Sequence, residues 1–340
     1  MIGEKKINKK KNNLIRIAVI GCGRWGSNHA RIFNELPGMQ LVICCDRDKN
    51  RLNDLKAQYP HIDVTSDLRK VLASPKVDAV IVATTPDETH FKIGKEVLKA
   101  GKHAFIEKPL ALSLKQAKEL IDLAKVKNKV LMTGHIYQYH PAIKKIKDYI
   151  QTKEITPVSI LSTRIESGIP ANREDANLLW ASAIHDVSII QYFLEKEPQK
   201  VSAIQNSLNT KKMGDILFIN LIFPNKIIGH IQAGFAGPYR ERKLVIHSPQ
   251  KIIVFDGLTE VLEIFSYKNF KKKARIGSRE YDKKFKKTQQ INFKGKQPLS
   301  IECQHFLDCI NNNKTPLSGG ENVLKVFRTL SRINNKLNKL

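Results

Sequence analysis

The segment Gly21-Cys22-Gly23-Arg24-Trp25-Gly26 constrains the fold of this 340-residue chain more than any other feature. It follows the apolar, β-branched run 15–20 and opens a helical pattern over residues 25–36. In a G-x-G-x-x-G of this kind the glycines allow a tight turn and a close approach of the backbone to a pyrophosphate. The N–H groups at the start of the helix then meet the phosphate charge. The segment therefore predicts a strand–loop–helix unit with a dinucleotide bound at Gly21, Gly23, Arg24, Trp25 and Gly26.

Asp46 supplies a second part of the same pattern. It ends the apolar run 41–45, about 20 residues beyond the loop, where a carboxylate can accept a hydrogen bond from a ribose 2′-hydroxyl. A carboxylate there disfavours a 2′-phosphate, whereas the adjacent Arg47 could pair with one. We therefore expect NAD as the cofactor and keep NADP as the alternative.

Strand-like and helix-like segments alternate as far as residue 134. Further strands are expected at 77–83, 103–106 and 130–133, and further helices at 48–58, 67–72, 91–100 and 114–127. This alternation indicates βαβ units and an α/β fold with an N-terminal, doubly wound parallel sheet.

The pattern changes after residue 134. One strand is expected at 158–164 and successive strands from 201 to 267, with Pro224-Asn225 as a hairpin turn. Helices are expected at 142–150, 178–194, 301–310 and 322–337. We predict a disordered basic tail over 1–13, a dinucleotide-binding domain over 14–134, and a C-terminal α+β domain over 135–320. The second domain would be built on a largely antiparallel open sheet, and helix 321–340 would pack back on the first domain.

The chain carries 58 Lys and Arg against 32 Asp and Glu, a net charge of +26. Residues 1–13 contribute +4 and residues 268–287 contribute +8, and the rest is diffuse. Polyanion binding is one interpretation, but neither stretch interleaves aromatic residues regularly enough for base stacking. A Lys-rich composition spread over solvated faces is favoured, and no nucleic-acid partner is expected.

Targeting and metal signals are also lacking in the sequence. No apolar run approaches the length of a membrane span, and the N-terminus has no signal-peptide core. The five cysteines show neither a metal-binding spacing nor a disulfide framework. We expect a cytoplasmic protein with no membrane partner and no metal site.

Two polar loops follow strands of the first sheet, where ligands of doubly wound folds bind. One is the loop from Thr84 to His90, and the other is Glu107-Lys108-Pro109. A lysine directly after an apolar strand places a cation where a reacting oxygen could lie beside a nicotinamide. Taken alone, Lys108 is equally compatible with a surface salt bridge.

The order and spacing of these motifs resemble the Gfo/Idh/MocA oxidoreductases, typified by glucose–fructose oxidoreductase and inositol dehydrogenase. The shared series is G-x-G-x-x-G, an acid after the second strand, T-P-x-x-x-H and E-K-P. Segments 134–142, 179–186 and 315–320 are also similar to family segments, so the resemblance runs from about residue 14 to the C-terminus.

The resemblance implies a Rossmann domain followed by an α/β domain whose open sheet often forms oligomer contacts. It implies that Thr85, Pro86 and His90 lie near the cofactor and Glu107 near the nicotinamide ribose. It also implies that Lys108 contacts the cofactor and the reacting substrate oxygen, and that His185 is the general acid/base, with both residues in the substrate site. Arg164 matches a family position that could meet a polar or anionic substrate group, and a plain salt bridge is the equal alternative.

The sequence departs from the family at Ala181. Family members usually carry Asp four residues before the histidine, and Asp186 cannot simply replace it because adjacent helix residues point in different directions. The leading hypothesis is an NAD(P)-dependent oxidoreductase acting on a sugar, sugar acid or nucleotide sugar in polysaccharide biosynthesis, assembled as a homodimer or homotetramer. The alternative is a catalytically weak or inactive cofactor-binding or regulatory protein.

Overall fold

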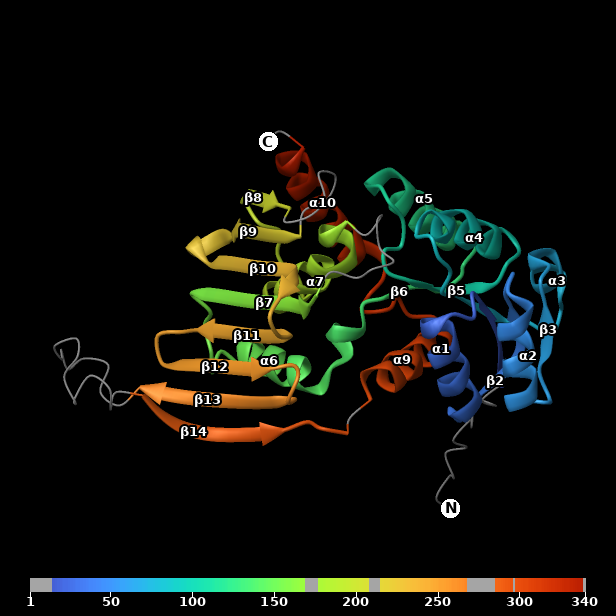
Figure 1. Ribbon diagram of the computed structural model, residues 1–340, viewed down its shortest axis with the longest axis horizontal. Coiled ribbons are helices and arrows are strands. Elements are labelled where there is room, and N and C mark those ends of the chain that lie inside the picture. The colour runs from blue at the N-terminus through green and yellow to red at the C-terminus, as the bar shows by residue number, and fades with distance from the viewer. Residues whose placement is uncertain (1–13, 169–176, 208–214, 268–284, 296, 339–340) are drawn as a thin grey trace, which may run out of the picture. The chain divides into compact units, whose positions relative to one another are not determined.

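The computed structural model describes residues 14–168, 177–207, 215–267, 285–295 and 297–338 (Figure 1). The tail predicted over 1–13 and most of the basic stretch 268–287 lie outside these ranges. The chain forms two compact units. The first comprises Met1–Leu112, Lys118–Gly134 and Leu299–Gly320, and the second comprises Ser113–Ala117, His135–Pro298 and Glu321–Leu340.

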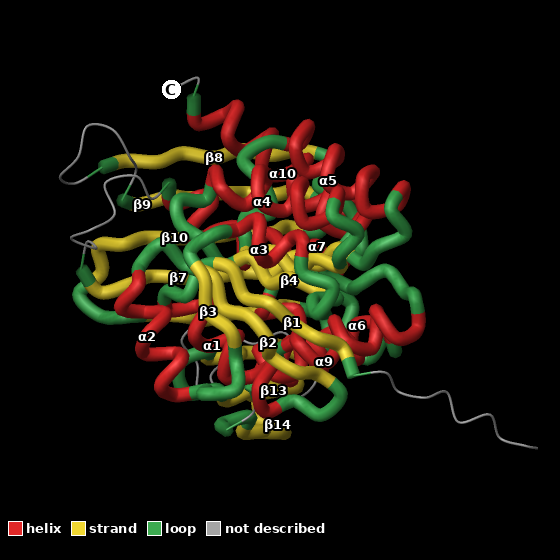
Figure 2. Tube along the Cα trace, turned by 90° about the vertical axis from the view of Figure 1, so that its right-hand side faces the viewer, coloured by secondary structure: helices red, strands yellow, loops and turns green. Residues whose placement is uncertain are grey.

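The first unit is built on a six-stranded parallel sheet of order β3-β2-β1-β4-β5-β6. Its strands are β1 (Ile15–Ile20), β2 (Met39–Cys45), β3 (Asp63–Thr65), β4 (Ala79–Val82), β5 (His103–Glu107) and β6 (Leu131–Gly134). Figure 2 shows β3, β2, β1 and β4 side by side. The sequence order reverses between β1 and β4, and in open α/β sheets ligands bind at the carboxyl ends of the strands beside such a reversal.

Helices connect these strands. They are α1 (Arg24–Glu35), α2 (Lys49–Gln58), α3 (Leu68–Ala73), α4 (Glu88–Lys99) and α5 (Leu114–Val126), with α9 (Pro298–Asn312) joining from later in the chain. Helix α2 begins where the Asp48 side chain accepts a hydrogen bond from the Asn50 N–H, and Asp67 caps α3 in the same way. Strand β4 is fully buried along its length, as expected for a parallel strand covered on both faces. The predicted doubly wound sheet is thus confirmed.

The second unit is built on an eight-stranded sheet of order β14-β13-β12-β11-β7-β10-β9-β8 (Figure 1). Its strands are β7 (Ser159–Ser167), β8 (Lys200–Asn206), β9 (Ile216–Ile222), β10 (Ile228–Gly237), β11 (Glu241–His247), β12 (Lys251–Asp256), β13 (Val261–Tyr267) and β14 (Phe285–Asn292). Only the β7–β10 pair is parallel among these described strands, so the largely antiparallel sheet is confirmed. The predicted turn joins β9 to β10, with Asn225 in the left-handed region at φ 61°.

Helical segments of this unit share one apolar core with the sheet. They are η1 (Ile136–Tyr139), α6 (Pro141–Gln151), η2 (Leu179–Ala183), α7 (Ile184–Leu194) and α10 (Gly320–Leu337). Segment η2 is a π-helical turn that leads directly into α7. A short helical turn, η3 (Pro224–Lys226), closes the β9–β10 hairpin.

The last two helices divide between the units differently from the prediction. Helix α10, expected to pack on the first domain, belongs to the second unit from Glu321 onward, and its apolar stripe of Val326, Leu330 and Ile333 is buried in the core of that unit. Helix α9, expected in the second domain, instead joins the first unit, where Phe306 packs edge-on against Phe105 of β5 at 5.7 Å between ring centroids.

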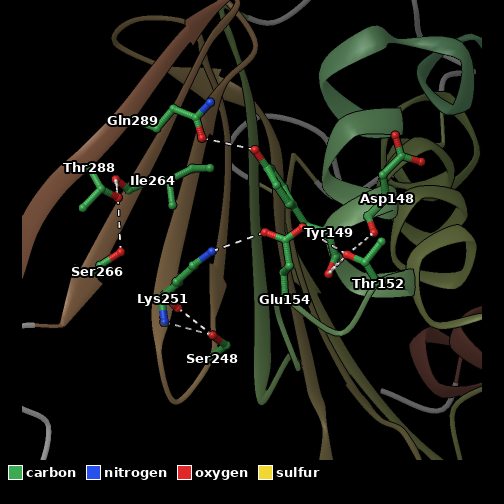
Figure 3. A network of polar contacts seen from close by, with 10 residues as sticks. All are labelled: Asp148, Tyr149, Thr152, Glu154, Ser248, Lys251, Ile264, Ser266, Thr288 and Gln289. Atoms are coloured by element: carbon green, nitrogen blue, oxygen red, sulfur yellow. Dashed lines mark hydrogen bonds and ion pairs between the residues drawn. The ribbon is translucent and has the colours of Figure 1, made fainter.

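Polar contacts fasten the β12–β14 end of the second sheet (Figure 3). The Tyr149 hydroxyl on α6 donates to the Gln289 side chain on β14 over 3.2 Å. The Lys251 ammonium on β12 lies 3.5 Å from the Glu154 carboxylate. Strand β14, which the sequence analysis did not predict, is thereby tied to α6 as well as paired with β13.

Within the described residues, no helix combines the length and the apolarity needed to cross a bilayer.

Candidate active site

The glycine-rich loop leaves β1 and enters α1 in a conformation that requires its glycines. Gly21 has φ +86°, and a Cβ at this position would lie 2.6 Å from the Ala83 carbonyl oxygen. A Cβ at Gly26 would lie 1.7 Å from the Gly21 carbonyl oxygen, so only glycine lets α1 approach the loop so closely. Gly23 is the N-cap of α1 and supplies no capping side chain. The first N–H groups of α1 are therefore suited to a phosphate.

Asp46 lies directly beside this loop. Its Oδ2 accepts a hydrogen bond from the Cys22 N–H over 2.5 Å, and its Oδ1 accepts one from the Asp48 N–H over 2.8 Å. Both bonds come from the backbone, so they fix the carboxylate while leaving it lone pairs for a ribose hydroxyl. The loop and the carboxylate thus fit the adenosine and pyrophosphate parts of NAD.

Arg51 is a residue of this region that the sequence analysis missed. Its Nη1 lies 3.8 Å from Asp46 Oδ2 and 3.6 Å from the position of a Cβ on Gly23, and its Nε lies 3.3 Å from Asp48 Oδ2. Arg47 follows Asp46 in the sequence and is exposed, so the region holds two arginines and the carboxylates of Asp46 and Asp48. The signal for Arg51 was its place on the first turn of the helix after Asp46.

The loop after β4 carries the predicted Thr85 and Pro86, and both are exposed. His90 is buried, at 2% exposure. Its Nδ1 lies 2.8 Å from the Pro109 carbonyl oxygen, and its Nε2 lies 2.8 Å from that of Thr84. His90 therefore connects the loop after β4 to the loop after β5, with one ring nitrogen hydrogen-bonded to each loop.

Glu107 ends β5, and Lys108 follows it in a half-buried position. Glu107 Oε1 lies 2.8 Å from His29 Nε2, and its Oε2 accepts the Lys108 N–H over 3.3 Å. Burial alone would raise the pKa of Glu107, but the hydrogen bond with His29 and the charge of Lys108 hold that pKa below its ordinary value. A Cβ on Gly134 would lie 2.8 Å from Oε2, so a glycine there leaves room for this carboxylate.

His185 lies on the first turn of α7, immediately after the π-helical turn Leu179–Ala183. Its ring packs edge-on against Tyr137, with 4.9 Å between the centroids. Ala181 lies within the π-helical turn. π-helical turns inside helices are frequent at functional sites.

Arg164 and Asp186 form a buried ion pair beside His185. Arg164 Nε and Nη2 donate to the two oxygens of Asp186 over 2.8 and 3.1 Å. Ser162 Oγ donates to the same carboxylate over 2.7 Å, and the guanidinium lies 4.4 Å from the Tyr137 ring centroid. Although burial opposes its charge, Asp186 raises the pKa of Arg164. Of the two alternatives for Arg164, the structure shows the salt bridge.

The predicted cofactor residues thus gather at the carboxyl ends of β1, β2, β4 and β5 in the first unit, and Arg164 and His185 lie together in the second. The first arrangement defines an NAD-binding unit of an oxidoreductase.

Comparisons with known proteins agree with this class. Residues 15–135 match the GFO/IDH/MocA profile described as an oxidoreductase family with an NAD-binding Rossmann fold. Residues 143–254 match the profile of the C-terminal domain of the same family. Together the two profiles cover more than half of the chain. The chain therefore belongs to the GFO/IDH/MocA family and is an NAD-dependent oxidoreductase.

Among its relatives is scyllo-inositol 2-dehydrogenase (NAD(+)) of Bacillus subtilis, 29% identical over 318 residues, or 89% of this chain and 88% of that one. UDP-N-acetylglucosamine 3-dehydrogenase of Acidithiobacillus ferrooxidans is 26% identical over 74% of this chain and 77% of that one. A solved structure of the latter enzyme covers 96% of this chain and 98% of its own at a TM-score of 0.84 and 23% identity. At that identity the structural likeness supports the fold.

Proposed function

We propose that this enzyme transfers a hydride between NAD and a carbinol carbon of a sugar, an inositol or a nucleotide-linked sugar. The observation that carries the proposal is the Glu107-Lys108 pair at the end of β5. It places a half-buried lysine next to a carboxylate whose pKa is held below its ordinary value, partly by the charge of that lysine, in a unit that binds NAD.

Each proposed role follows from the chemistry of the side chain. NAD, when bound, supplies the hydride acceptor. The Lys108 ammonium donates a hydrogen bond to the substrate oxygen and stabilises the negative charge that develops there as the proton leaves. The His185 imidazole takes that proton in the oxidative direction and returns it in the reductive one, because its ordinary pKa lies near neutrality. The edge-on Tyr137 ring orients the imidazole.

For the substrate, a nucleotide-linked sugar is our first candidate and a free inositol or sugar the second. The UDP-N-acetylglucosamine 3-dehydrogenase relative and the excess of basic residues support the first, since a diphosphate is anionic. The scyllo-inositol dehydrogenase relative supports the second. A nucleotide sugar would place the reaction in polysaccharide biosynthesis.

A turnover assay tests both candidates. The purified chain is given NAD or NADP with UDP-N-acetylglucosamine, scyllo-inositol, myo-inositol and glucose, and reduction is followed by nicotinamide absorbance. Turnover of the nucleotide sugar alone supports the first candidate, and turnover of a free polyol alone supports the second. Tight NADH binding without turnover of any of these compounds would support the alternative, a catalytically inactive protein. The relatives named as dehydrogenases do not favour that alternative.

We also propose that the chain forms a homodimer or homotetramer through the face of the second sheet that carries Phe218. On β9, Leu217, Ile219 and Leu221 are fully buried, whereas Phe218 between them is half-exposed and stacks on His230 of β10. Replacing Phe218 with Asp would place a charge in such an interface. We expect the wild-type mass in solution to be a multiple of the 38.6 kDa chain and the Phe218→Asp mass to be lower. A wild-type monomer at micromolar concentration would contradict the proposal.

The five cysteines bear on the compartment. All are buried free thiols, and persistent free thiols are typical of reducing compartments. We therefore propose a cytoplasmic location.

A further inference from the structure

A buried row of titratable side chains lies behind Glu107 in the first unit. His29 of α1 is fully buried, and its Nε2 lies 2.8 Å from Glu107 Oε1. On the other side of the ring, Nδ1 lies 3.8 Å from the Cys303 sulfur of α9. The neighbouring Glu302 is also buried. Nothing in the proposed chemistry uses His29, Glu302 or Cys303 directly.

The two ends of the His29 ring have different partners, and these determine where its proton resides. Burial, reinforced by the nearby carboxyls, raises the pKa of the Cys303 thiol well above its ordinary value. The thiol therefore keeps its hydrogen and donates it to Nδ1. An imidazole that accepts a hydrogen bond at Nδ1 carries its hydrogen on Nε2. That hydrogen points at Glu107 Oε1.

Ionisable groups from four parts of the first unit surround the Glu107 carboxylate. They are His29 of α1, His90 of α4, Lys108 after β5, and Glu302 of α9. Burial and the charge of Glu107 raise the pKa of Glu302 well above its ordinary value. Within the described residues, Glu302 Oε1 has no hydrogen-bond partner that would stabilise a charge. The pKa of Glu302 is thus raised while that of Glu107 is held below its ordinary value, so Glu107 is the more acidic of the two carboxyls.

We propose that His29 is a positioning residue, whose Nε2–H holds the Glu107 carboxylate in place beside Lys108. The inference rests on the proposed function of the Glu107-Lys108 pair. His29 is fully buried, and its hydrogen bond is to Glu107. It therefore acts on the Glu107-Lys108 pair through Glu107. Without its hydrogen bond, burial would raise the pKa of Glu107, and Glu107 would take up a proton at a higher pH than in the wild type.

The matched variants are His29→Leu, which removes the donor, and His29→Gln, whose side-chain amide can donate from nearly the same place. Ile32→Ala, on the same helix but apolar, is the control for lost packing. With the carbonyl product of a turnover-assay substrate and NADH, His185 must be protonated, so its titration sets the alkaline limb of the kcat/KM profile. In that reductive direction we expect the acid limb of His29→Leu to move up by about one pH unit or more. His29→Gln and Ile32→Ala should keep the wild-type limb. The proposal would be overturned if a folded His29→Leu kept the wild-type acid limb, or if the acid limb of His29→Gln moved as far as that of His29→Leu.

Two measurements on the protein do not depend on turnover. Nitrogen NMR of the wild-type imidazole at neutral pH should find the proton on His29 Nε2, and an unprotonated Nε2 would overturn the assignment even if His29→Leu fails to fold. The dissociation constant of NADH should rise on acidification at a higher pH in His29→Leu than in the wild type. If no substrate is turned over but both of these results hold, the proposed function fails while the role of His29 stands.

Discussion

Arg164 and Asp186 are joined by two hydrogen bonds, of 2.8 and 3.1 Å, in the interior of the second unit. Asp186 immediately follows His185 on α7, and the Arg164 guanidinium and the His185 ring contact the same Tyr137 side chain. The pair therefore fixes the start of α7 and the surroundings of the proposed acid/base.

Breaking this pair on one side should be costly. Asp186→Asn leaves the Arg164 charge buried without its counter-ion, so we expect the free energy of unfolding to fall by about 3–5 kcal/mol. Denaturant unfolding of Asp186→Asn, Arg164→Met and the double variant measures this loss of stability. The double variant should lose less than the sum of the single variants, because it contains no unpaired buried charge. Strictly additive losses would show that the two side chains are not coupled.

Cofactor preference should depend on the balance between Asp46 and its flanking arginines. Asp46→Ser removes the carboxylate that we expect to accept from the ribose 2′-hydroxyl, and it frees the Arg51 guanidinium to meet a 2′-phosphate. We expect the affinity for NADH to fall about tenfold and that for NADPH to rise by a similar factor, which corresponds to about 1.4 kcal/mol each. Calorimetric titration with each cofactor measures both.

Arg51→Ala in the Asp46→Ser background provides the control. Arg51→Ala should cancel the gain in NADPH affinity without restoring the affinity for NADH. If the double variant binds NADPH as tightly as Asp46→Ser does, Arg51 takes no part in cofactor preference.

His140 should make stability depend on pH. It is buried at the start of α6, where its Nδ1 accepts the Ala142 N–H over 3.1 Å, and burial lowers the pKa of His140 to about 4. In the unfolded chain its pKa is ordinary, near 6.5. Between these values the unfolded state binds the extra proton, so stability is complete above about pH 6.5 and is lost as the pH falls toward 4.

His140→Asn keeps an N-cap acceptor but does not titrate in this range. We expect the decrease in unfolding free energy between pH 6.5 and 4 to be smaller in this variant by about 1–3 kcal/mol. Equal decreases in the two proteins would show that His140 is not the residue responsible.

The parts of the fold that the sequence predicted are those with local signals. Strand β1, the glycine loop and α1 were recognisable because apolar runs, glycines and helical periodicity are properties of short segments. Strand β3 has only three residues, and β14 carries Lys286 and Lys287 at the edge of its sheet, where charge protects an exposed edge but hides the apolar alternation. Both strands were missed for these reasons.

The site was less predictable than the fold. Asp46, Glu107 and Lys108 stood at strand ends and could be found, whereas the contact of His29 with Glu107 joins residues 78 positions apart. No local pattern reports such a pair. The π-helical turn before His185 was likewise invisible, because a 3.6-residue periodicity fits the segment 178–194 about as well. The unit to which α10 belongs depends on the core in which its apolar stripe is buried, and the sequence of the helix does not specify that core.

The most direct test of the central claim is hydride transfer by wild-type enzyme and by Lys108→Ala and His185→Ala, with a substrate deuterated at the carbinol carbon. We expect the wild type to deliver deuterium to the reduced nicotinamide. Each variant should lose about a hundredfold to ten-thousandfold in kcat, with NADH affinity changed little in His185→Ala. Full turnover by either variant, or reduced cofactor without deuterium, would contradict the account.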